Sequence, residues 1–253
     1  MIVRKSEAEI EFMREAGRLS ARVLRVVGEA VRVGITTQQL DELAEEVILA
    51  GGGIPAFKGY HGFPKTLCTS VNSQVVHGIP SSSVTLADGD ILSVDVGAIV
   101  DGYYGDNART FAVGTISGSA ANLLSATHAS LSAGIAQCVV GNRLFDIGHA
   151  VQGVAEAAGF SVVREYVGHG IGRNMHEDPN VPNYGTAGKG PRLEAGMVFA
   201  IEPMINMGVK EVLHLKDGGT VLTKDGKPSA HFEHDVHITK AGPDILTSFE
   251  EIE

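Results

Sequence analysis

Cysteine is scarce in this 253-residue sequence, which contains only Cys68 and Cys138. Two cysteines exclude a disulfide framework and are typical of a reducing compartment. Basic residues are also few, 20 against 30 acidic ones, and the net charge of −10 argues against nucleic acid as a main partner. No apolar run reaches signal-peptide or membrane-spanning length, so we expect a cytoplasmic protein.

Glycine, in contrast, is abundant. Its 32 residues in a chain of 253 are well above the typical glycine content of about 7%. This content predicts many tight turns and places where the backbone lies close to other atoms. The hydrophobic fraction of 43% is ample for a core, in one large domain or two small ones. No linker, low-complexity segment or appended domain interrupts the pattern.

Helix signals begin the chain. Residues 6–9 read Ser-Glu-Ala-Glu, a capping box, and the apolar residues that follow at helical spacing predict a long amphipathic helix. Gly34 ends this segment. Thr36 or Thr37 then caps a second predicted helix, which the glycines at 51–53 close.

The same order returns in the second half of the chain. Helical patterns cover 120–140 and continue past Gly141, which aligns with Gly34. Strands are expected at 67–76, 90–100, 161–167, 197–204, 211–223 and 230–239. Two similar halves, of about residues 6–115 and 119–240, predict an α+β fold with pseudo-twofold symmetry, antiparallel sheet and a site between the halves.

Residues 93–106 contain the most informative stretch. Asp101-Gly102 favours a two-residue hairpin turn, which pairs Asp95 with Ala108 and places Asp106 on the same face as Asp95. The two carboxylates then have Cβ atoms about 7–8 Å apart or somewhat less. If the hairpin is buried, two facing carboxylates repel unless a cation lies between them. The alternative is a solvated hairpin with ordinary surface aspartates.

Three further segments offer metal ligands. Glycines flank His169 and leave its imidazole accessible, Glu202 ends a predicted strand, and Glu233 lies inside another. Each residue taken singly also has an ordinary structural interpretation. His169 could be a hydrogen-bonded histidine, Glu202 a glutamate at a strand end, and Glu233 a surface glutamate on an edge strand. Together with the hairpin pair they supply five oxygen or nitrogen ligands, which match a two-metal site with bridging carboxylates.

The chain resembles the type I methionine aminopeptidases at these residues. The matching stretches are 59–65 (Gly-Tyr-His-Gly-Phe-Pro-Lys), Asn72 with 77–80 (His-Gly-Ile-Pro), Asp95 with Asp106, 168–172 (Gly-His-Gly-Ile-Gly) with His176-Glu177, 200–203 (Ala-Ile-Glu-Pro) and 229–234 (Ser-Ala-His-Phe-Glu-His). The resemblance covers about residues 6–239. It implies the pita-bread fold, a pseudo-twofold pair of αβ halves, in a single catalytic domain over residues 1–253.

The resemblance also implies roles. Asp106 and Glu233 would bridge two divalent ions, His169 and Glu202 would complete one ion, and Asp95 would chelate the other. Glu202 could shuttle the proton of the attacking water. The ions would be Co, Mn, Fe or Zn, which all accept this ligand mix. Some family members also hold a monovalent cation, at positions that correspond here to Asn72, Gln74 and Ser229.

Two histidines are implied to contact the substrate. His77 and His176 have no metal role in the family and stabilise the tetrahedral intermediate there. A corner histidine bonded to backbone and a loop-capping histidine are the structural alternatives. An apolar pocket for the methionine side chain would be lined by His77 with Tyr60, Phe63 and Cys68, since aromatic walls and a sulfur suit a thioether. Catalysis by a Cys68 thiolate is rejected, because no motif around it activates a thiol.

The chain departs from the family at several positions. Phe57, Met175 and Gly219 stand where members often have Cys, Phe and Trp, so we expect a reshaped pocket. His231 and Asp235 stand where Gln and Thr are usual. An added carboxylate at Asp235 is expected to shift metal affinity.

Three functions follow as hypotheses. The first is removal of the initiator methionine from nascent proteins and peptides, preferably ahead of a small second residue, by a monomer with transient ribosome contact. The second is an Xaa-Pro peptidase, although those enzymes usually carry an extra N-terminal domain. The third is a non-catalytic binding protein, which the intact ligand set argues against.

Overall fold

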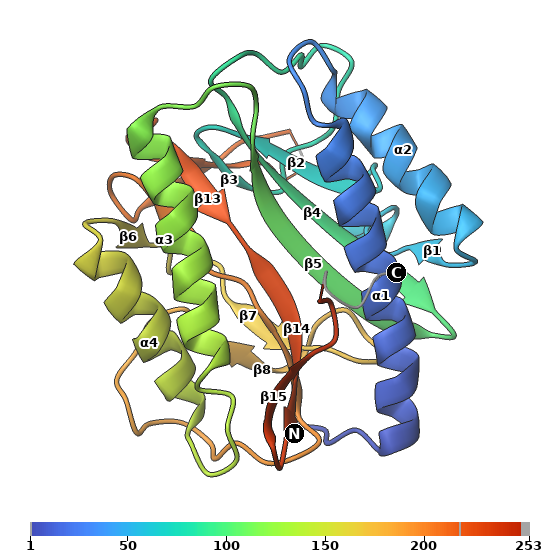
Figure 1. The fold of residues 1–253 in the computed structure, drawn as a ribbon, viewed down its shortest axis with the longest axis vertical. Coiled ribbons are helices and arrows are strands. Elements are labelled where there is room, and N and C mark those ends of the chain that lie inside the picture. Colours follow the sequence, from blue (N-terminus) through green and yellow to red (C-terminus); the bar gives the residue numbers. More distant parts are fainter. Residues whose placement is uncertain (1, 218, 249–253) are drawn as a thin grey trace.

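The computed structural model describes residues 2–217 and 219–248 (Figure 1). Its chain passes twice through the same order, a pair of helices followed by strands, and each of these two passes is called a round. The helices are α1 (Glu7–Ala30), α2 (Thr37–Ala50), α3 (Gly118–Ile135) and α4 (Leu144–Ala157), with a 3₁₀ turn η1 (Tyr60–Gly62). The strands of the first round are β1 (Ile54–Pro55), β2 (Leu67–Val71), β3 (Gln74–Val76), β4 (Ile91–Val100) and β5 (Tyr103–Ala112). Those of the second are β6 (Ser161–Val162), β7 (Gly168–Gly170), β8 (Glu177–Val181), β9 (Val198–Ile201), β10 (Met204–Asn206), β11 (Val212–His214), β12 (Val221–Thr223), β13 (Ser229–His231), β14 (Glu233–Thr239) and β15 (Gly242–Ile245).

A central antiparallel sheet joins the two rounds. Among the described residues it has nine strands in the order β1-β4-β5-β14-β9-β7-β8, with β2 beside β4 and β15 beside β14. Strand β14 of the second round pairs with β5 of the first, so the sheet is continuous across the molecule. Two small sheets, β13-β10-β6 and β11-β12-β3, lie beside it. The predicted α+β class with antiparallel sheet is confirmed.

The two helix pairs cover different parts of this sheet. In Figure 1, α1 and α2 lie to one side and α3 and α4 to the other, with β4, β5 and β14 running between them. Apolar side chains of α1 and α2 pack on β2 and β4, and those of α3 and α4 pack on β9 and β14.

The first helix begins as predicted, because the Ser6 side chain accepts from the Glu9 N–H and the Glu9 carboxylate accepts from the Ser6 N–H.

The hairpin register predicted from the sequence is confirmed. Val100 pairs with Tyr103 and Asp95 with Ala108. Asp101 and Gly102 adopt φ values of 50° and 78°, as a two-residue turn matched to the strand twist requires. The two long strands bring both aspartates to one place in the sheet.

Four predicted strands prove to be interrupted. The one at 197–204 is divided between β9 and β10 by Glu202 and Pro203, and the strand predicted at 161–167 is shorter, at Ser161–Val162 only. Strands β2 and β3 are separated by a turn in which Asn72 adopts a φ of 52°, and the segment at 211–223 is a hairpin of β11 and β12. The segment at 230–239 breaks at Phe232, because β13 pairs with β10 in a small sheet whereas β14 joins the central one. A period-two pattern cannot reveal such a change of sheet, since both strands keep their alternation.

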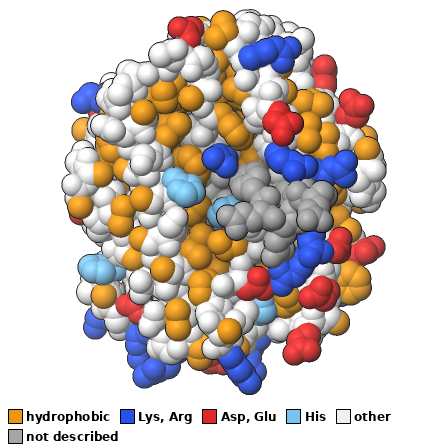
Figure 2. Space-filling model, viewed as in Figure 1, with side chains coloured by type: hydrophobic (Ala, Val, Ile, Leu, Met, Phe, Trp, Pro, Cys, Tyr) orange, Lys and Arg blue, Asp and Glu red, His pale blue; other side chains and the backbone are white. Residues whose placement is uncertain are grey.

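The surface carries both signs of charge. On the face in Figure 2, Lys and Arg side chains lie among Asp and Glu side chains, with apolar side chains between them. No helix in the described ranges is long and apolar enough to span a bilayer.

Candidate metal centre

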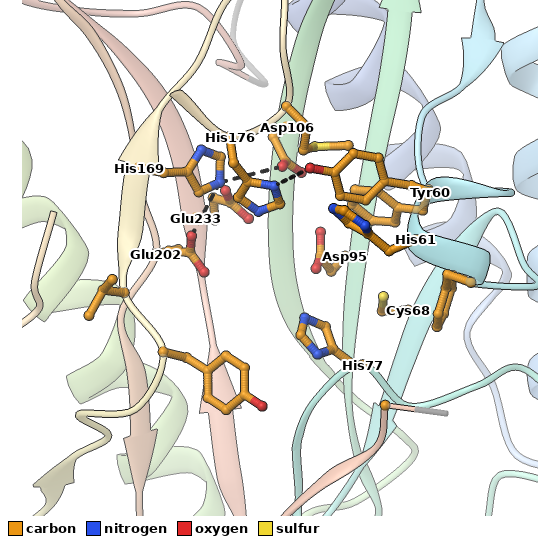
Figure 3. A pocket seen from close by; sticks show the side chains of 16 residues that line it. Tyr60, His61, Cys68, His77, Asp95, Asp106, His169, His176, Glu202 and Glu233 are labelled. Atoms are coloured by element: carbon orange, nitrogen blue, oxygen red, sulfur yellow. Dashed lines mark hydrogen bonds and ion pairs between the residues drawn. The ribbon is translucent and has the colours of Figure 1, made fainter. Parts of the chain in front are cut away.

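One pocket of about 370 Å³ lies beside the central sheet, where segments of both rounds meet. Such a volume suits a small-molecule or side-chain site. All the residues that the sequence indicated for the site line it: Tyr60, Phe63, Cys68, His77, Asp95, Asp106, His169, His176, Glu202 and Glu233. Figure 3 shows His169, Glu202 and Glu233 on one side of this pocket and Asp95, Cys68 and His77 on the other.

The β4–β5 hairpin supplies the two aspartates. Asp106 is buried, at 5% exposure, and lies opposite Gly97 in the ladder. A Cβ at Gly97 would lie 2.8 Å from the Phe57 ring and 2.8 Å from the Ala56 Cβ, so only glycine lets the pocket wall pack against the strand here. The hairpin thus carries the carboxylates and also sets the position of an apolar wall.

His169 lies at the centre of β7. Its flanking glycines are required, because a Cβ at Gly168 would lie 2.3 Å from the Ala200 carbonyl oxygen and one at Gly170 2.2 Å from that of Asp178. The His169 Nδ1 donates to the Gly170 carbonyl at 2.9 Å. Since a carbonyl only accepts, the neutral ring keeps a free lone pair on Nε2.

That lone pair points towards carboxylates. The His169 Nε2 lies 3.5 Å from Glu202 Oε1 and 4.0 Å from Asp106 Oδ2 (Figure 3). Glu202 follows β9 directly, and β9 pairs with β7 so that His169 faces Ala200. Glu233 begins β14 and faces Ala108 of β5, which places it beside the hairpin.

Burial controls the charge state of these groups. It raises the pKa of Asp106 to about 7 and raises the pKa values of Glu202 and Glu233 well above the ordinary range, with the Asp106 charge adding to both. The pKa of Asp95 is raised by burial and then by Asp106. Burial lowers the pKa of His169 to about 4, so this imidazole is neutral at pH 7. Buried carboxyl groups that resist ionisation beside a neutral imidazole are typical of a site where a bound cation would stabilise the carboxylate form.

Several donor atoms here also lack partners. The oxygens Asp95 Oδ1, Asp106 Oδ1 and Glu233 Oε1 are buried without a hydrogen bond, which costs about 1–3 kcal/mol each. Asp106, His169 and Glu233 each offer one possible ligand atom, and these three atoms lie within 4.8 Å of one another. Carboxylate and imidazole donors at this spacing fit a divalent metal ion.

His77 and His176 line the same pocket as the carboxylates. The His77 backbone adopts a φ of 60°, a strained conformation for a non-glycine residue that the His77–Pro80 corner imposes. The ring of His176 lies 4.3 Å from that of His169, and its Nδ1 is 2.8 Å from the Tyr60 hydroxyl. Burial lowers the pKa of both histidines, so each is neutral at pH 7.

The rest of the pocket is apolar. Phe57, Phe63, Cys68 and Met175 contribute to its lining, and Cys68 pairs with Asp95 across β2 and β4. Burial raises the pKa of the Cys68 thiol well above its ordinary value, so a thiolate nucleophile is excluded. The sulfur therefore acts as part of the wall.

Three lining residues received no role in the sequence analysis, and His61 of the η1 turn is one of them. Tyr166 and Val167 come from the segment before β7. The Tyr166 ring contacts His77 edge-on at 5.4 Å, and its hydroxyl bonds His214 Nε2 at 3.0 Å. Their place directly before the Gly-His-Gly segment was the only signal available.

The profile of metallopeptidase family M24 matches residues 11–240. The chain is 52% identical to a methionine aminopeptidase of Clostridium acetobutylicum over 98% of its own length and 99% of that protein, and 44% identical to the Escherichia coli enzyme over 96% and 92%. Among solved structures, the methionine aminopeptidase of Thermotoga maritima superposes with a TM-score of 0.97 at 44% identity and covers 98% of this chain and 100% of that one. The prolidase of Pyrococcus furiosus shares the fold, with a TM-score of 0.76 at 21% identity, and this chain spans 65% of it.

Proposed function

The chain belongs to metallopeptidase family M24 and has the activity of a methionine aminopeptidase, and we propose that five side chains of the pocket hold its divalent ions. The observation that carries this proposal is the buried group of Asp106, His169 and Glu233, whose ligand atoms lie within 4.8 Å of one another beside a side-chain-sized pocket. Glu202 and Asp95 complete the set.

The roles of the ligands follow from their places. Asp106 and Glu233 meet at the β5–β14 junction and would bridge two ions. His169 and Glu202 lie together and would complete one ion, whereas Asp95 would chelate the other. The imidazole and carboxylate donors suit Co, Mn, Fe or Zn. When bound, two such ions polarise a carbonyl group and lower the pKa of water.

Proton transfer is assigned to Glu202. Its side chain lines the pocket with 15% exposure, and burial raises its pKa, so it can accept a proton from water and return it to the departing amine. Glu202 therefore serves as the general base and then as the general acid.

His77 and His176 would donate hydrogen bonds to the reacting carbonyl. Burial raises the pKa of the Tyr60 hydroxyl, which stays protonated and can donate to His176 Nδ1. His176 then carries its own proton on Nε2 and can donate it into the pocket. Donors aimed at the developing oxyanion stabilise the transition state more than the ground state.

The substrate is a peptide with a free N-terminal methionine. Its thioether would pack among Tyr60, Phe63, Cys68 and the ring of His77. Asp95 would face the α-amino group, which limits cleavage to the first peptide bond. A small second residue is preferred, because the pocket mouth must admit the chain between His77 and His176.

Hydrolysis by metal-stripped protein tests this function. Peptides beginning Met-Ala, Leu-Ala and Met-Pro are incubated with the stripped protein, with and without added Mn or Co. We expect metal-restored release of Met ahead of Leu. A preference for proline in the second position, whatever residue comes first, would indicate an Xaa-Pro peptidase. Measured metal binding without any cleavage would indicate a binding protein.

Finer features of the site and its partners are also proposed. Asn72, Gln74 and Ser229 come together where the Ser229 N–H donates to the Asn72 carbonyl at 2.9 Å, which supports a monovalent-cation site. We propose a monomer that contacts the ribosome transiently, because nascent chains are its substrates. Light scattering and co-sedimentation with ribosomes test these two points.

The single catalytic domain is proposed to contain two related halves, about 6–115 and 119–240. Gly34 and Gly141 both adopt positive φ, and each precedes a 14-residue helix, α2 or α4. The isolated bridges Thr36–Thr85 and Arg143–Arg192 occupy equivalent places in the two rounds. These correspondences support a repeat within one cooperative unit.

A further inference from the structure

His231 is a second buried imidazole beside the ligand group. It ends β13, is 2% exposed, and its Nε2 has no hydrogen-bond partner. This atom lies 3.8 Å from Glu202 Oε2 and 4.0 Å from Glu233 Oε2. Both distances are too long for hydrogen bonds, so a buried ring nitrogen faces two carboxylates without contacting either.

These separations match those of His169. The His169 Nε2 lies 3.5 Å and 4.0 Å from its two nearest carboxylates, Glu202 and Asp106. Two atoms bound to one ion at about 2.1 Å lie at most about 4.2 Å apart. The His231 Nε2 is therefore close enough to share an ion with either glutamate, as the His169 Nε2 is.

The backbone holds His231 in this direction. Its N–H donates to the Thr110 hydroxyl at 2.9 Å, and the same hydroxyl donates to the His231 carbonyl at 2.9 Å. Strand pairing opposite Met204 holds the other edge of the residue. These contacts fix the backbone of His231 on both sides, so the side chain starts from a defined position beside the glutamates.

We propose that His231 is a sixth metal ligand, which shares a divalent ion with Glu202 and Glu233. The inference rests on the proposed function, since it assumes that the glutamates bind metal. A second imidazole would favour borderline ions such as Zn, Fe and Co over Mn, which prefers oxygen ligands. His231 thus supplies metal selectivity at a position that the five-ligand set leaves unassigned.

Nitrogen NMR of the histidine rings tests this assignment. The full-length protein is labelled with ¹⁵N-histidine, stripped of metal and titrated with zinc chloride. We expect two Nε2 resonances to move on zinc binding, one absent in His169→Gln and the other absent in His231→Gln. His149→Gln is the control, because His149 is exposed on α4, away from the pocket.

The outcomes are distinguishable. Movement of the His169 resonance alone would overturn the assignment of His231 and leave the five-ligand set intact. Movement of neither resonance would instead overturn the proposed metal centre. If His231→Gln does not fold, His231→Asn is the second variant, because it also removes the imidazole and identifies the His231 resonance.

Calorimetry provides a second measurement. The His231→Gln variant is expected to bind zinc about tenfold or more weakly, with a smaller change for manganese. Equal losses for both ions would contradict the proposed selectivity, and no loss for either would contradict ligation.

Discussion

Single buried atoms control the chemistry of this pocket. The hydrogen bond from His169 Nδ1 to a backbone carbonyl leaves Nε2 free, and the Tyr60 hydroxyl opposite His176 Nδ1 leaves Nε2 as the nitrogen for the proposed substrate contact. Each tautomer is set by a neighbour outside the ligand set, as is common where histidines serve metal or substrate. The residues proposed to bind metal or substrate therefore depend on neighbours that have neither role.

Replacement of Tyr60 by phenylalanine tests this dependence. Without the hydroxyl, either nitrogen of His176 can carry the proton, so we expect kcat to fall about tenfold with a smaller change in KM. Steady-state kinetics on a Met-Ala peptide measure both constants. Tyr184→Phe, away from the pocket, is the control. An unchanged kcat would show that Tyr60 does not orient His176.

The buried Asp235 carboxylate offers a test of charge near the ligands. Its Oδ2 accepts from the Asp106 N–H at 2.8 Å, and its Oδ1 has no partner. In Asp235→Thr a hydroxyl can accept the same bond, so activity is retained, but loss of a carboxyl group that a bound cation would help to ionise weakens divalent-ion binding about tenfold. Metal titration followed by calorimetry measures the change. Glu46→Gln, on an exposed face of α2, should leave the titration curve unaltered, and an identical curve for Asp235→Thr would contradict the prediction.

The hairpin and the first helix depend on each other at the scale of elements. Gly105 of β5 lies against α1, where a Cβ would come within 2.4 Å of the Ala16 carbonyl carbon and 2.5 Å of the Gly17 nitrogen. Both atoms belong to the backbone of α1, so they cannot move away as the end of a flexible side chain could. Helix α1 thus packs directly on the strand that carries Asp106.

Gly105→Ala is therefore expected to lower the free energy of unfolding by about 1–3 kcal/mol. Urea denaturation measures this change. Gly153 of α4 provides a matched control, because nothing lies within 4 Å of a Cβ there. At that exposed helical position alanine should raise stability by about 0.5–1 kcal/mol. Equal effects at both positions would contradict the packing argument.

At the scale of the whole molecule, the two rounds bring together charges that neither round would bury alone. Asp95 and Asp106 come from the first round, whereas His169, Glu202 and Glu233 come from the second. Without metal, folding keeps these acids protonated to higher pH than in the unfolded chain, as the pKa of about 7 for Asp106 shows. Folded and unfolded states then bind different numbers of protons, so stability depends on pH.

The sign of this dependence can be predicted between pH 6.5 and 8.5. Acids with raised pKa values in the folded state lose their stabilising proton as pH rises, so the metal-free protein becomes less stable. Buried histidines such as His169 act in the opposite sense, but only below about pH 6.5, where unfolded imidazoles gain charge. Thermal unfolding midpoints should fall across this range without metal.

Bound Mn or Zn should reverse this trend, because ionised ligands then gain a partner. Midpoints measured at pH 6.5, 7.5 and 8.5, with and without metal, are the test. A metal-free midpoint that rises with pH would contradict the assignment of raised pKa values to the carboxylates. A single transition is also expected, since the sheet crosses both halves.

The sequence by itself determined the structural features that depend only on residues a few positions apart in the chain. The Ser6 cap, the hairpin register about Asp101-Gly102 and the glycines beside His169 follow from local sterics and from periods of 2 and 3.6 residues. These features predicted the α+β class and the ligand-bearing segments. Resemblance to a known family supplied the roles of the ligands, which local patterns do not contain.

Only the tertiary structure decided which side chains meet. The break at Phe232 sends His231 and Glu233 into different sheets, yet both remain within 4.0 Å of each other at Nε2 and Oε2. Asp235 reaches Asp106 across 129 residues of chain, and Tyr60 reaches His176 across 116. Such contacts depend on how sheets and helices pack, because no short-range preference specifies the direction of a buried side chain towards a distant strand.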